Sequence, residues 1–152
     1  MVWGGICYNG KTNLYFVAKG KTLNAERYQA PLEEEITDEV SDLFGDSNWT
    51  FLHDGAPAHR AASTRDWLQE NGITASNDFP SNSPDLNIIE NIWHTMKHRL
   101  YARRIYYDST GLERALRRVW NGIQVQEIRV LIDSMPKRIQ ECIEQQGGHT
   151  SY

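Results

Sequence analysis

The sequence predicts an α/β fold in which a sheet is followed by a helical C-terminal flank. Three observations support this prediction: β-branched and aromatic residues open the chain, strand-like and helix-like segments alternate through its middle, and helical periodicity alone follows. The 152 residues are the size of one ordinary domain. Hydrophobic residues make up 39% and aromatic residues 11%, which excludes a disordered chain. We therefore expect one globular domain over residues 1–152.

The chain opens with a predicted β-hairpin. Residues 2–8 and 13–18 favour strands, and Asn9-Gly10 between them is a strong turn signal. From Asn24 the pattern becomes helical, with Pro31 marking an irregular entry and acidic residues on a solvated outer face. The apolar positions of this helix are Leu32, Ile36, Val40 and Leu43.

A strand, a tight turn and a helix are predicted next. Residues 49–53 form a strand-like run that ends at Asp54-Gly55, and Pro57 opens a helix that ends at Asn71-Gly72. A short strand at 73–76 and a loop at 80–84 follow. Asp85 is predicted to cap the next helix, whose apolar positions are Leu86, Ile89, Trp93, Met96 and Leu100.

The remaining chain is predicted to be helical. Ser109 or Thr110 caps a helix that runs through Trp120, and residues 126–146 form one helix or a pair interrupted near Pro136. Three tryptophans at apolar helical positions are predicted to be core residues rather than platforms for base stacking: Trp67, Trp93 and Trp120.

The charge changes along the chain. The 16 basic and 20 acidic residues give a net charge of −4, which taken alone disfavours a nucleic-acid binder. Residues 1–90, however, hold 6 basic and 14 acidic residues, a net of −8, whereas residues 91–152 hold 10 and 6, a net of +4. The acidic total therefore conceals a basic C-terminal portion.

Several classes of protein are disfavoured. Cys7 and Cys142 lie at opposite ends without zinc-type spacing, so neither a disulfide framework nor a structural zinc site is expected. No apolar run approaches the roughly 18 to 20 residues that span a bilayer, and residues 2–5 do not resemble a signal peptide. The segment HTMKH at 94–98 lacks the glutamate of the H-E-x-x-H zinc-peptidase motif. We expect a protein that is neither secreted nor in a membrane.

Two carboxylates stand where a metal site could form. Asp54 lies at the predicted end of a strand, and Glu90 lies in the helix predicted to begin at Asp85. Mg²⁺ takes one or two carboxylates together with water and phosphate oxygens. Both residues also have plainer explanations, because Asp-Gly is a common turn sequence and Glu90 could be an ordinary solvated helix residue.

Two longer segments resemble the catalytic core of Tc/mariner-type DDE transposases. They are FLHDGAPAHRA at 51–61 and FPSNSPDLNIIENIWHTMKHRL at 79–100. In that family the second catalytic Asp opens a D-x-x-P-x-H pattern, and the third acid is the Glu of an S-P-D-L-N-x-x-E-N-x-W motif. The matching positions are Asp54, with His59, and Glu90, between Asn87 and Asn91. The resemblance extends to residues 2–20 and 131–152 and so covers essentially the whole chain.

The resemblance implies a ribonuclease H-like fold and phosphoryl transfer on DNA. Three carboxylates in the family hold two Mg²⁺ ions, for which Mn²⁺ can substitute, and the reaction is DNA strand cleavage and strand transfer. Asp54 and Glu90 are the expected catalytic and metal-binding residues, with His59, Asn87 and Asn91 as supports. The implied partners are transposon-end and target DNA and a second copy of the chain, with no small-molecule substrate. The implied location is the nucleus in a eukaryote and the cytoplasm otherwise.

The sequence departs from the family pattern in two ways. Residues 55–89 separate Asp54 from Glu90, one more residue than in the closest branch, with the extra residue expected at 76–78. The first catalytic Asp of the family lies on a strand before the V-W-G hairpin, so no residue here is assigned to it, and no helix-turn-helix region is assigned either. We therefore expect an incomplete ribonuclease H-like catalytic domain, without its central first strand, that neither cuts nor joins DNA alone.

Basic residues follow Glu90 on the same helix and at its exit. They are predicted to contact DNA phosphates, although cations near a helix C-terminus are also favourable without DNA: His94, Lys97, His98, Arg99, Arg103 and Arg104. His59 could equally be a helix-surface histidine. Two other functions stay open: a non-catalytic, transposon-derived DNA-binding or interaction module, and another ribonuclease H-like nuclease.

Overall fold

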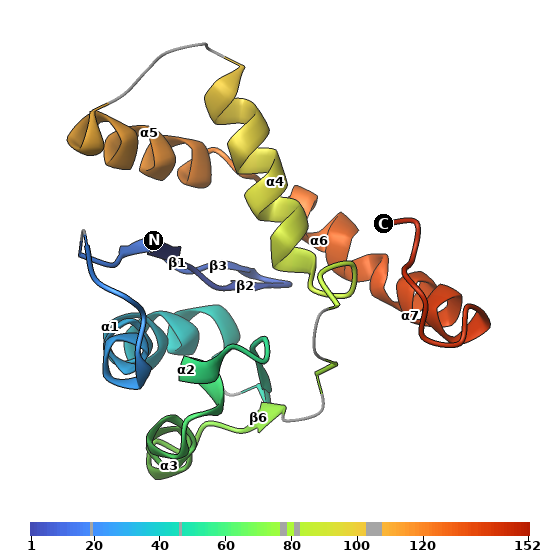
Figure 1. Ribbon diagram of the computed structural model, residues 1–152, viewed down its shortest axis with the longest axis horizontal. Helices are drawn as coiled ribbons and strands as arrows, with labels where there is room; N and C mark the ends of the chain where they lie inside the picture. Colours follow the sequence, from blue (N-terminus) through green and yellow to red (C-terminus); the bar gives the residue numbers. More distant parts are fainter. Residues whose placement is uncertain (19, 46, 77–78, 81–82, 103–107) are drawn as a thin grey trace. The chain divides into compact units, whose positions relative to one another are not determined.

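The computed structural model describes residues 1–18, 20–45, 47–76, 79–80, 83–102 and 108–152, without the side chains of 35–39 and 41. The chain divides into two compact units, each of which is described by itself. Unit 1 comprises residues 1–4 and 15–82, and unit 2 comprises residues 5–14 and 83–152. The elements of both units are labelled in Figure 1.

Unit 1 contains one antiparallel and one parallel pair of strands. Strand β1 (Val2–Trp3) runs antiparallel to β4 (Tyr15–Phe16). Strand β5 (Phe51–Leu52) runs parallel to β6 (Ala75–Ser76), with Phe51 opposite Ala75. The predicted strands at 49–53 and 73–76 are thus confirmed, and the mixture of directions agrees with the predicted α/β class. Within the described residues, the two pairs are separate two-stranded ladders.

Three helices complete the described part of unit 1: α1 (Ala25–Phe44), α2 (Pro57–Arg60) and α3 (Ala62–Glu70). They lie together in Figure 1, and α1 packs against both α2 and α3. The unit 1 core consists of Tyr28, Leu32, Val40, Ala58 and Leu68, with Trp67 packed against it. The helical spacing of Leu32 and Val40 therefore predicted the buried face of α1 correctly, whereas the side chain of Ile36 lies outside the described residues.

Two details of these helices differ from the prediction. Pro31 does not mark the entry to α1 but lies inside it and is fully buried, so the burial of this side of the helix offsets the lost backbone hydrogen bond. The single helix expected from Pro57 is broken at Ala61, whose backbone is extended (φ −57°, ψ 142°). Thr64 closes this break, since its buried hydroxyl donates to the Ala58 carbonyl at 2.8 Å.

Unit 2 begins with the predicted hairpin, but its turn is shifted by one residue. Strand β2 (Ile6–Cys7) pairs with β3 (Gly10–Lys11), and Cys7 lies opposite Gly10, so the two turn residues are Tyr8 and Asn9. None of these residues has a positive φ. An Asn-Gly turn of type I′ requires positive φ at both positions, and the prediction of an Asn9-Gly10 turn is therefore wrong in register.

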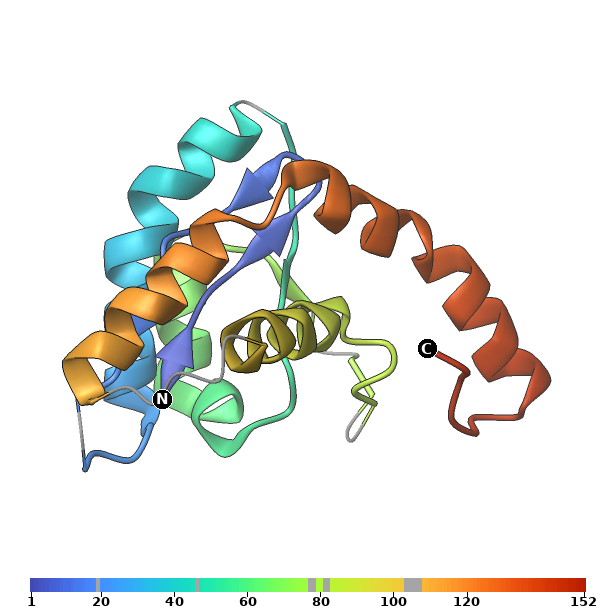
Figure 2. The same cartoon turned by 90° about the horizontal axis from the view of Figure 1, so that it is seen from above.

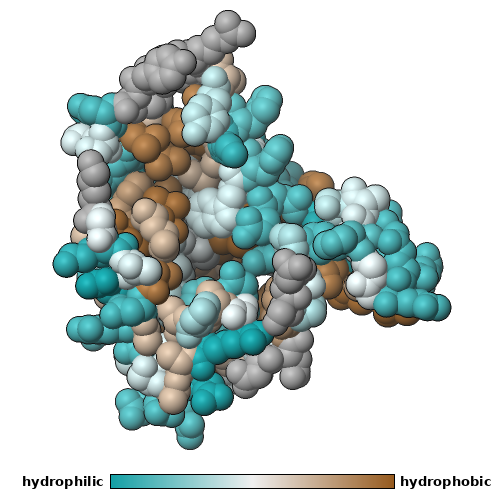
Figure 3. Space-filling view, in the orientation of Figure 1, coloured by the Kyte–Doolittle hydropathy of each residue, from teal (hydrophilic) through white to brown (hydrophobic). Residues whose placement is uncertain are grey.

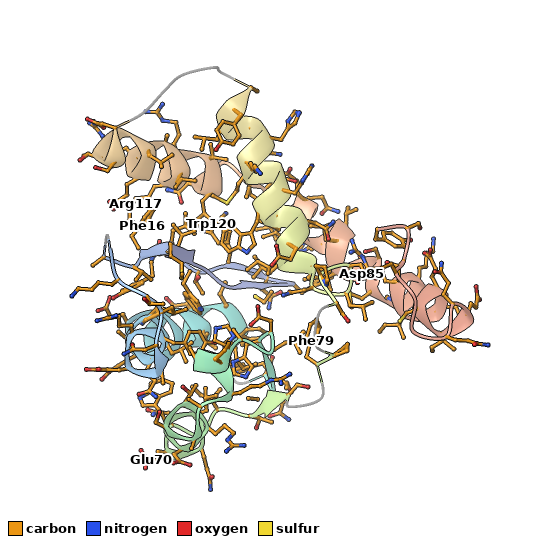
Figure 4. All side chains as sticks on the ribbon, viewed as in Figure 1. Phe16, Glu70, Phe79, Asp85, Arg117 and Trp120 are labelled. Atoms are coloured by element: carbon orange, nitrogen blue, oxygen red, sulfur yellow. The ribbon has the colours of Figure 1, made fainter. Side chains whose placement is uncertain are left out.

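Among the residues of unit 2 that the structure describes, four helices follow: α4 (Ile88–Tyr101), α5 (Ser109–Asn121), α6 (Val125–Asp133) and α7 (Met135–Glu144). Trp120, 1% exposed, points from α5 toward the hairpin strand, as Figure 4 shows. Its indole N–H donates to the Thr12 carbonyl at 2.7 Å, and its ring stacks on Trp93 of α4 with centroids 5.4 Å apart. The predicted core role of Trp120 is confirmed, and the break near Pro136 falls at Ser134.

The starts of α4 and α5 correct two predicted caps. The N-cap of α4 is Asn87 rather than Asp85, so Glu90 lies in the first turn of the helix. The N-cap of α5 is Asp108, whose carboxylate accepts from the Gly111 N–H at 2.6 Å, rather than Ser109 or Thr110. Spacing alone did not separate neighbouring polar residues that can all act as caps.

After α7 the chain folds back along that helix (Figures 1 and 2). The Ser151 N–H and hydroxyl donate to the two carboxylate oxygens of Glu141, at 2.8 and 3.0 Å. The space-filling view of Figure 3 shows a surface that mixes hydrophilic and hydrophobic areas. No helix within the described ranges is long and apolar enough to cross a membrane.

Candidate metal and DNA site

Asp54 lies two residues beyond β5, at the end of a parallel strand of unit 1. Its side-chain oxygen Oδ1 accepts a hydrogen bond from the Ala56 N–H at 3.0 Å, which fixes the tight turn that leads into α2. The side chain is 49% exposed. The other carboxylate oxygen accepts no hydrogen bond from the residues that the structure describes. Asp54 therefore combines a fixed orientation with one oxygen that is open within the described part of the chain.

His59 of α2 lies beside Asp54 rather than on the helix surface. Its Nδ1 is 2.7 Å from Asp54 Oδ1 and 3.2 Å from the Asp54 carbonyl oxygen, and its side chain is only 13% exposed. An ionised carboxylate can only accept a hydrogen bond, so the His59 ring carries its proton on Nδ1, and this N–H donates a hydrogen bond to Asp54. The D-x-x-P-x-H spacing thus brings the histidine back against the acid through one turn of helix.

Two further rings extend this contact into the core of unit 1. The His53 ring stacks on His59, with centroids 5.2 Å apart and planes 3° from parallel. The fully buried Tyr28 hydroxyl is 3.0 Å from His53 Nδ1. Burial and the nearby His59 lower the pKa of His53 to about 4, against the opposing charge of Asp54. Burial, and then the negative charge of Asp54, raise the pKa of Tyr28. At neutral pH, Tyr28 therefore donates to a neutral His53.

A cavity of about 210 Å³ opens beside these residues. Its lining includes Asp54, His53 and His59 together with two guanidinium-bearing residues, Arg60 and Arg65. Gly55 leaves room for one of them, because a Cβ at this position would lie 2.8 Å from Arg60 Cζ. Guanidinium groups are well suited to binding phosphate oxygens, so the cavity presents cations around a carboxylate.

Glu90 occupies a contrasting setting in unit 2. It lies in the first turn of α4, its side chain is exposed, and it has no hydrogen-bond or ion-pair partner among the described residues. Asn87 caps the helix without a side-chain hydrogen bond. Asn91 accepts a hydrogen bond through Oδ1 from the guanidinium of Arg138 at 3.0 Å. Of the two predicted supporting residues near Glu90, Asn91 therefore makes a side-chain contact, with Arg138, that holds the start of α4.

Asp54 lies in unit 1 and Glu90 in unit 2, so the surroundings of each acid are described separately. Within the described ranges, no group of three or more potential metal-ligating side chains occurs. Carboxylate oxygens, backbone and water are the ligands that Mg²⁺ accepts, and it commonly uses only one or two carboxylates from the protein. The donors present, two exposed carboxylates, are of the type that Mg²⁺ takes.

The predicted basic residues differ in what they contact. His94, Lys97 and His98 are exposed on α4, whereas Arg103 and Arg104 lie outside the described residues. Arg99 forms an ion pair with Glu127 of α6. His98 and Arg99 also line a cavity of about 390 Å³ with Arg118 of α5. The structure therefore adds Arg118, which the sequence did not indicate, to the basic group.

Comparisons with known proteins identify the family to which the chain is similar. Residues 1–113 match the sequence profile of the DDE superfamily endonuclease family. The chain is 31% identical over its whole length to the transposable element Tc3 transposase of Caenorhabditis elegans and spans 45% of that protein.

Two solved structures have a similar fold. The Mos1 transposase catalytic domain, solved with raltegravir and Mg, matches with a TM-score of 0.82 at 23% identity, covering 99% of this chain and 75% of that one. A Mos1 transposase paired-end complex with the left transposon end matches with a TM-score of 0.79 at 23% identity, covering 97% and 43%. The predicted ribonuclease H-like fold is confirmed.

The profile match covers well over half of the chain and includes both candidate acids. The chain therefore belongs to the DDE superfamily endonuclease family, and it is similar to transposases of the Tc/mariner type.

Proposed function

We propose that this chain supplies two carboxylates, Asp54 and Glu90, to a metal-dependent centre for DNA strand cleavage and transfer. The main support for this proposal is the hydrogen bonding of the Asp54 carboxylate. One oxygen is held by the Ala56 N–H and by His59, and the other is open to a ligand within the described structure. Glu90 contributes an exposed carboxylate at the start of a helix.

The proposed ions are Mg²⁺, with Mn²⁺ as a substitute. When bound, such ions activate an attacking water or 3′-hydroxyl and stabilise the leaving oxygen. The residues of the chain would hold the ions and orient the DNA phosphate. Asp54 and Glu90 would be ligands, His59 keeps the Asp54 carboxylate in one rotamer through Nδ1–H, and Arg60 and Arg65 would bind a phosphate beside Asp54.

We propose further that these residues form part of a single catalytic domain whose remaining acid is not among the 152 residues. The family uses three carboxylates, and the resemblance assigns only two here. With one ligand of the shared site missing, the isolated chain should bind ions weakly and leave DNA uncut. Strand nicking in Mg²⁺ or Mn²⁺ that disappears on Asp54→Ala would contradict this expectation.

DNA is the proposed partner. The net charge of +4 over residues 91–152, and the cavity that brings His98 and Arg99 together with Arg118, support binding of phosphates by unit 2. The Mos1 complex with a transposon end supports the same partner by analogy. A homodimer on transposon ends, and a nuclear location in a eukaryotic cell, follow from the resemblance as parts of this proposal.

A metal-dependent thermal shift tests the metal-binding role. A ligand at ten times its dissociation constant stabilises the folded state by about 1.4 kcal/mol, so saturating Mn²⁺ should raise the melting temperature by a few degrees. Asp54→Asn and Glu90→Gln should each reduce the shift. The matched control is Asp66→Asn, an exposed acid on α3 of unit 1. Equal shifts in all four proteins would refute specific binding at the two acids.

The alternative function is DNA binding without catalysis. The cavity lined by Arg99 and Arg118 supports it, because this group needs no metal to bind phosphate. The two functions separate by metal dependence: DNA affinity in a purely binding module is the same with Mg²⁺ or with chelator and is unchanged by Asp54→Asn.

A further inference from the structure

Arg138 of α7 is a buried cation in unit 2. The residue is 1% exposed, and its Nε donates to the Ser134 hydroxyl at 2.8 Å. Among the described residues, no ion pair joins Arg138 to a carboxylate. A buried guanidinium needs partners for its donors, and here they are neutral acceptors. The identity of those acceptors indicates what the residue does.

The remaining contacts of Arg138 converge on the start of α4. Its Nη1 donates to the Asp85 carbonyl at 2.6 Å and to Asn91 Oδ1 at 3.0 Å. Asp85 lies in the turn before the helix, and Asn91 lies one residue after Glu90. A single amino group therefore ties the chain together on both sides of Glu90 without touching its carboxylate.

The last residues of the chain close over this contact. The Tyr152 ring lies 4.5 Å from Arg138 Cζ, in cation–π geometry. The Thr150 N–H donates to Asp85 Oδ2 at 2.9 Å, which lowers the pKa of that carboxyl. Figure 4 marks Asp85 at the turn that leads into α4. Arg138 therefore holds the turn before Glu90 through the Asp85 backbone carbonyl, and Thr150 holds it through the Asp85 carboxylate.

We infer that Arg138 is the positioning residue for the Glu90 carboxylate, an inference that rests on the proposed function of Glu90. The first turn of a helix has N–H groups without intrahelical partners and frays readily, and Asn87 makes no side-chain cap here. Metal ligands must be held within about 0.5 Å of their working positions. Arg138 supplies that restraint from a helix 47 residues further along the chain.

Amide hydrogen exchange of the whole 152-residue chain, without metal or DNA, tests the restraint. The reporter is the Glu90 N–H, which donates to the Asn87 carbonyl at 2.9 Å. Arg138→Gln should speed its exchange about ten-fold, while the Gly122 N–H at the end of α5 should change little. The control Lys137→Gln removes the same charge from an exposed neighbour and should have no effect. Unchanged exchange at Glu90, or an equal increase throughout unit 2, would overturn the inference.

A second variant covers the case in which Arg138→Gln does not fold. Tyr152→Ala removes only the half-exposed ring above the guanidinium, and should speed exchange at Glu90 about three-fold with Gly122 unaffected. No local effect in this variant would count against the inference in the same way.

A purely structural role of Arg138 would leave metal binding at Glu90 unchanged, so Mn²⁺ binding is a second measurement that separates the two roles. Arg138→Gln should raise, about three-fold or more, the Mn²⁺ concentration that half-broadens the Glu90 NMR signal, and leave the concentration that half-broadens the signal of the exposed control acid Asp66 unchanged. Equal values in both proteins would overturn the positioning role. A wild-type Glu90 without any Mn²⁺ response would refute the proposed function instead, and hydrogen exchange alone would then decide whether Arg138 holds the helix start.

Discussion

The buried ring cluster behind Asp54 makes a quantitative prediction about Tyr28→Phe. The substitution keeps the aromatic ring, which is fully buried, and removes only the hydroxyl that lies 3.0 Å from His53 Nδ1. His53 then has a partly buried acceptor without its donor, for which mutational data give a cost of about 1–2 kcal/mol. For a chain of this length, each kcal/mol lowers the melting temperature by about 2–4 °C, so we expect a decrease of about 2–8 °C.

Thermal unfolding followed by circular dichroism measures this decrease. The matched control is Tyr8→Phe, which removes a hydroxyl from a tyrosine that is 47% exposed in the hairpin turn, and should shift the melting temperature by less than about 1 °C. A fall no larger for Tyr28→Phe than for Tyr8→Phe would refute the reasoning that the Tyr28 hydroxyl supports His53 and, through the stacked His59, Asp54.

Three further predictions concern the pH dependence, the core of unit 2 and the basic cavity. The pKa of His53 is lower in the folded than in the unfolded chain, so the stability that neutral His53 contributes is complete above about pH 6.5 and is lost as the pH falls toward 4; His53→Gln should flatten this part of a stability profile measured by urea unfolding. Trp120→Phe leaves the Thr12 carbonyl without its donor and should lower the free energy of unfolding by about 1–3 kcal/mol in the same assay. Arg118→Gln should reduce the salt dependence of DNA binding, the slope of log K against log salt falling by about one, and an unchanged slope would exclude a phosphate contact.

The sequence allowed much of the fold to be predicted, because its strands and helices carry clear periodicity. The strand before Asp54, the helix start at Pro57 and the break near Pro136 all appear where expected, although the helix from Pro57 is interrupted at Ala61. Element boundaries were less accurate. Asp85 and Asn87 are both good caps by residue type, and only the three-dimensional packing decides which of them begins α4.

The local surroundings of Asp54 could be predicted only in part. His59 is five residues from Asp54, and its place beside the acid follows from a turn and one turn of helix. Tyr28 could not be predicted, because it comes from α1 and meets His53 through tertiary packing over 25 residues of sequence. The spacing of apolar residues along a helix carries no information about a hydrogen-bond partner in another element.

The contacts around Glu90 were even harder to predict from the sequence. The motif around Glu90 contains Asn91, and the sequence gives no reason why an amide should follow the acid. The structure supplies one in Arg138, which lies 47 residues away and bonds to the Asn91 side chain. A single basic residue in a helix with several charges carries no signal of burial, so this partner could be found only from coordinates.

Residue-resolved Mn²⁺ titration of the chain, followed by NMR, measures directly whether Asp54 and Glu90 hold divalent ions. Signals of Asp54 and Glu90 should broaden at lower Mn²⁺ concentrations than those of Glu34 and Asp42, exposed acids on α1 that serve as internal controls. Excess Mg²⁺ should reverse the broadening. Broadening of all four residues at the same Mn²⁺ concentration would contradict this prediction.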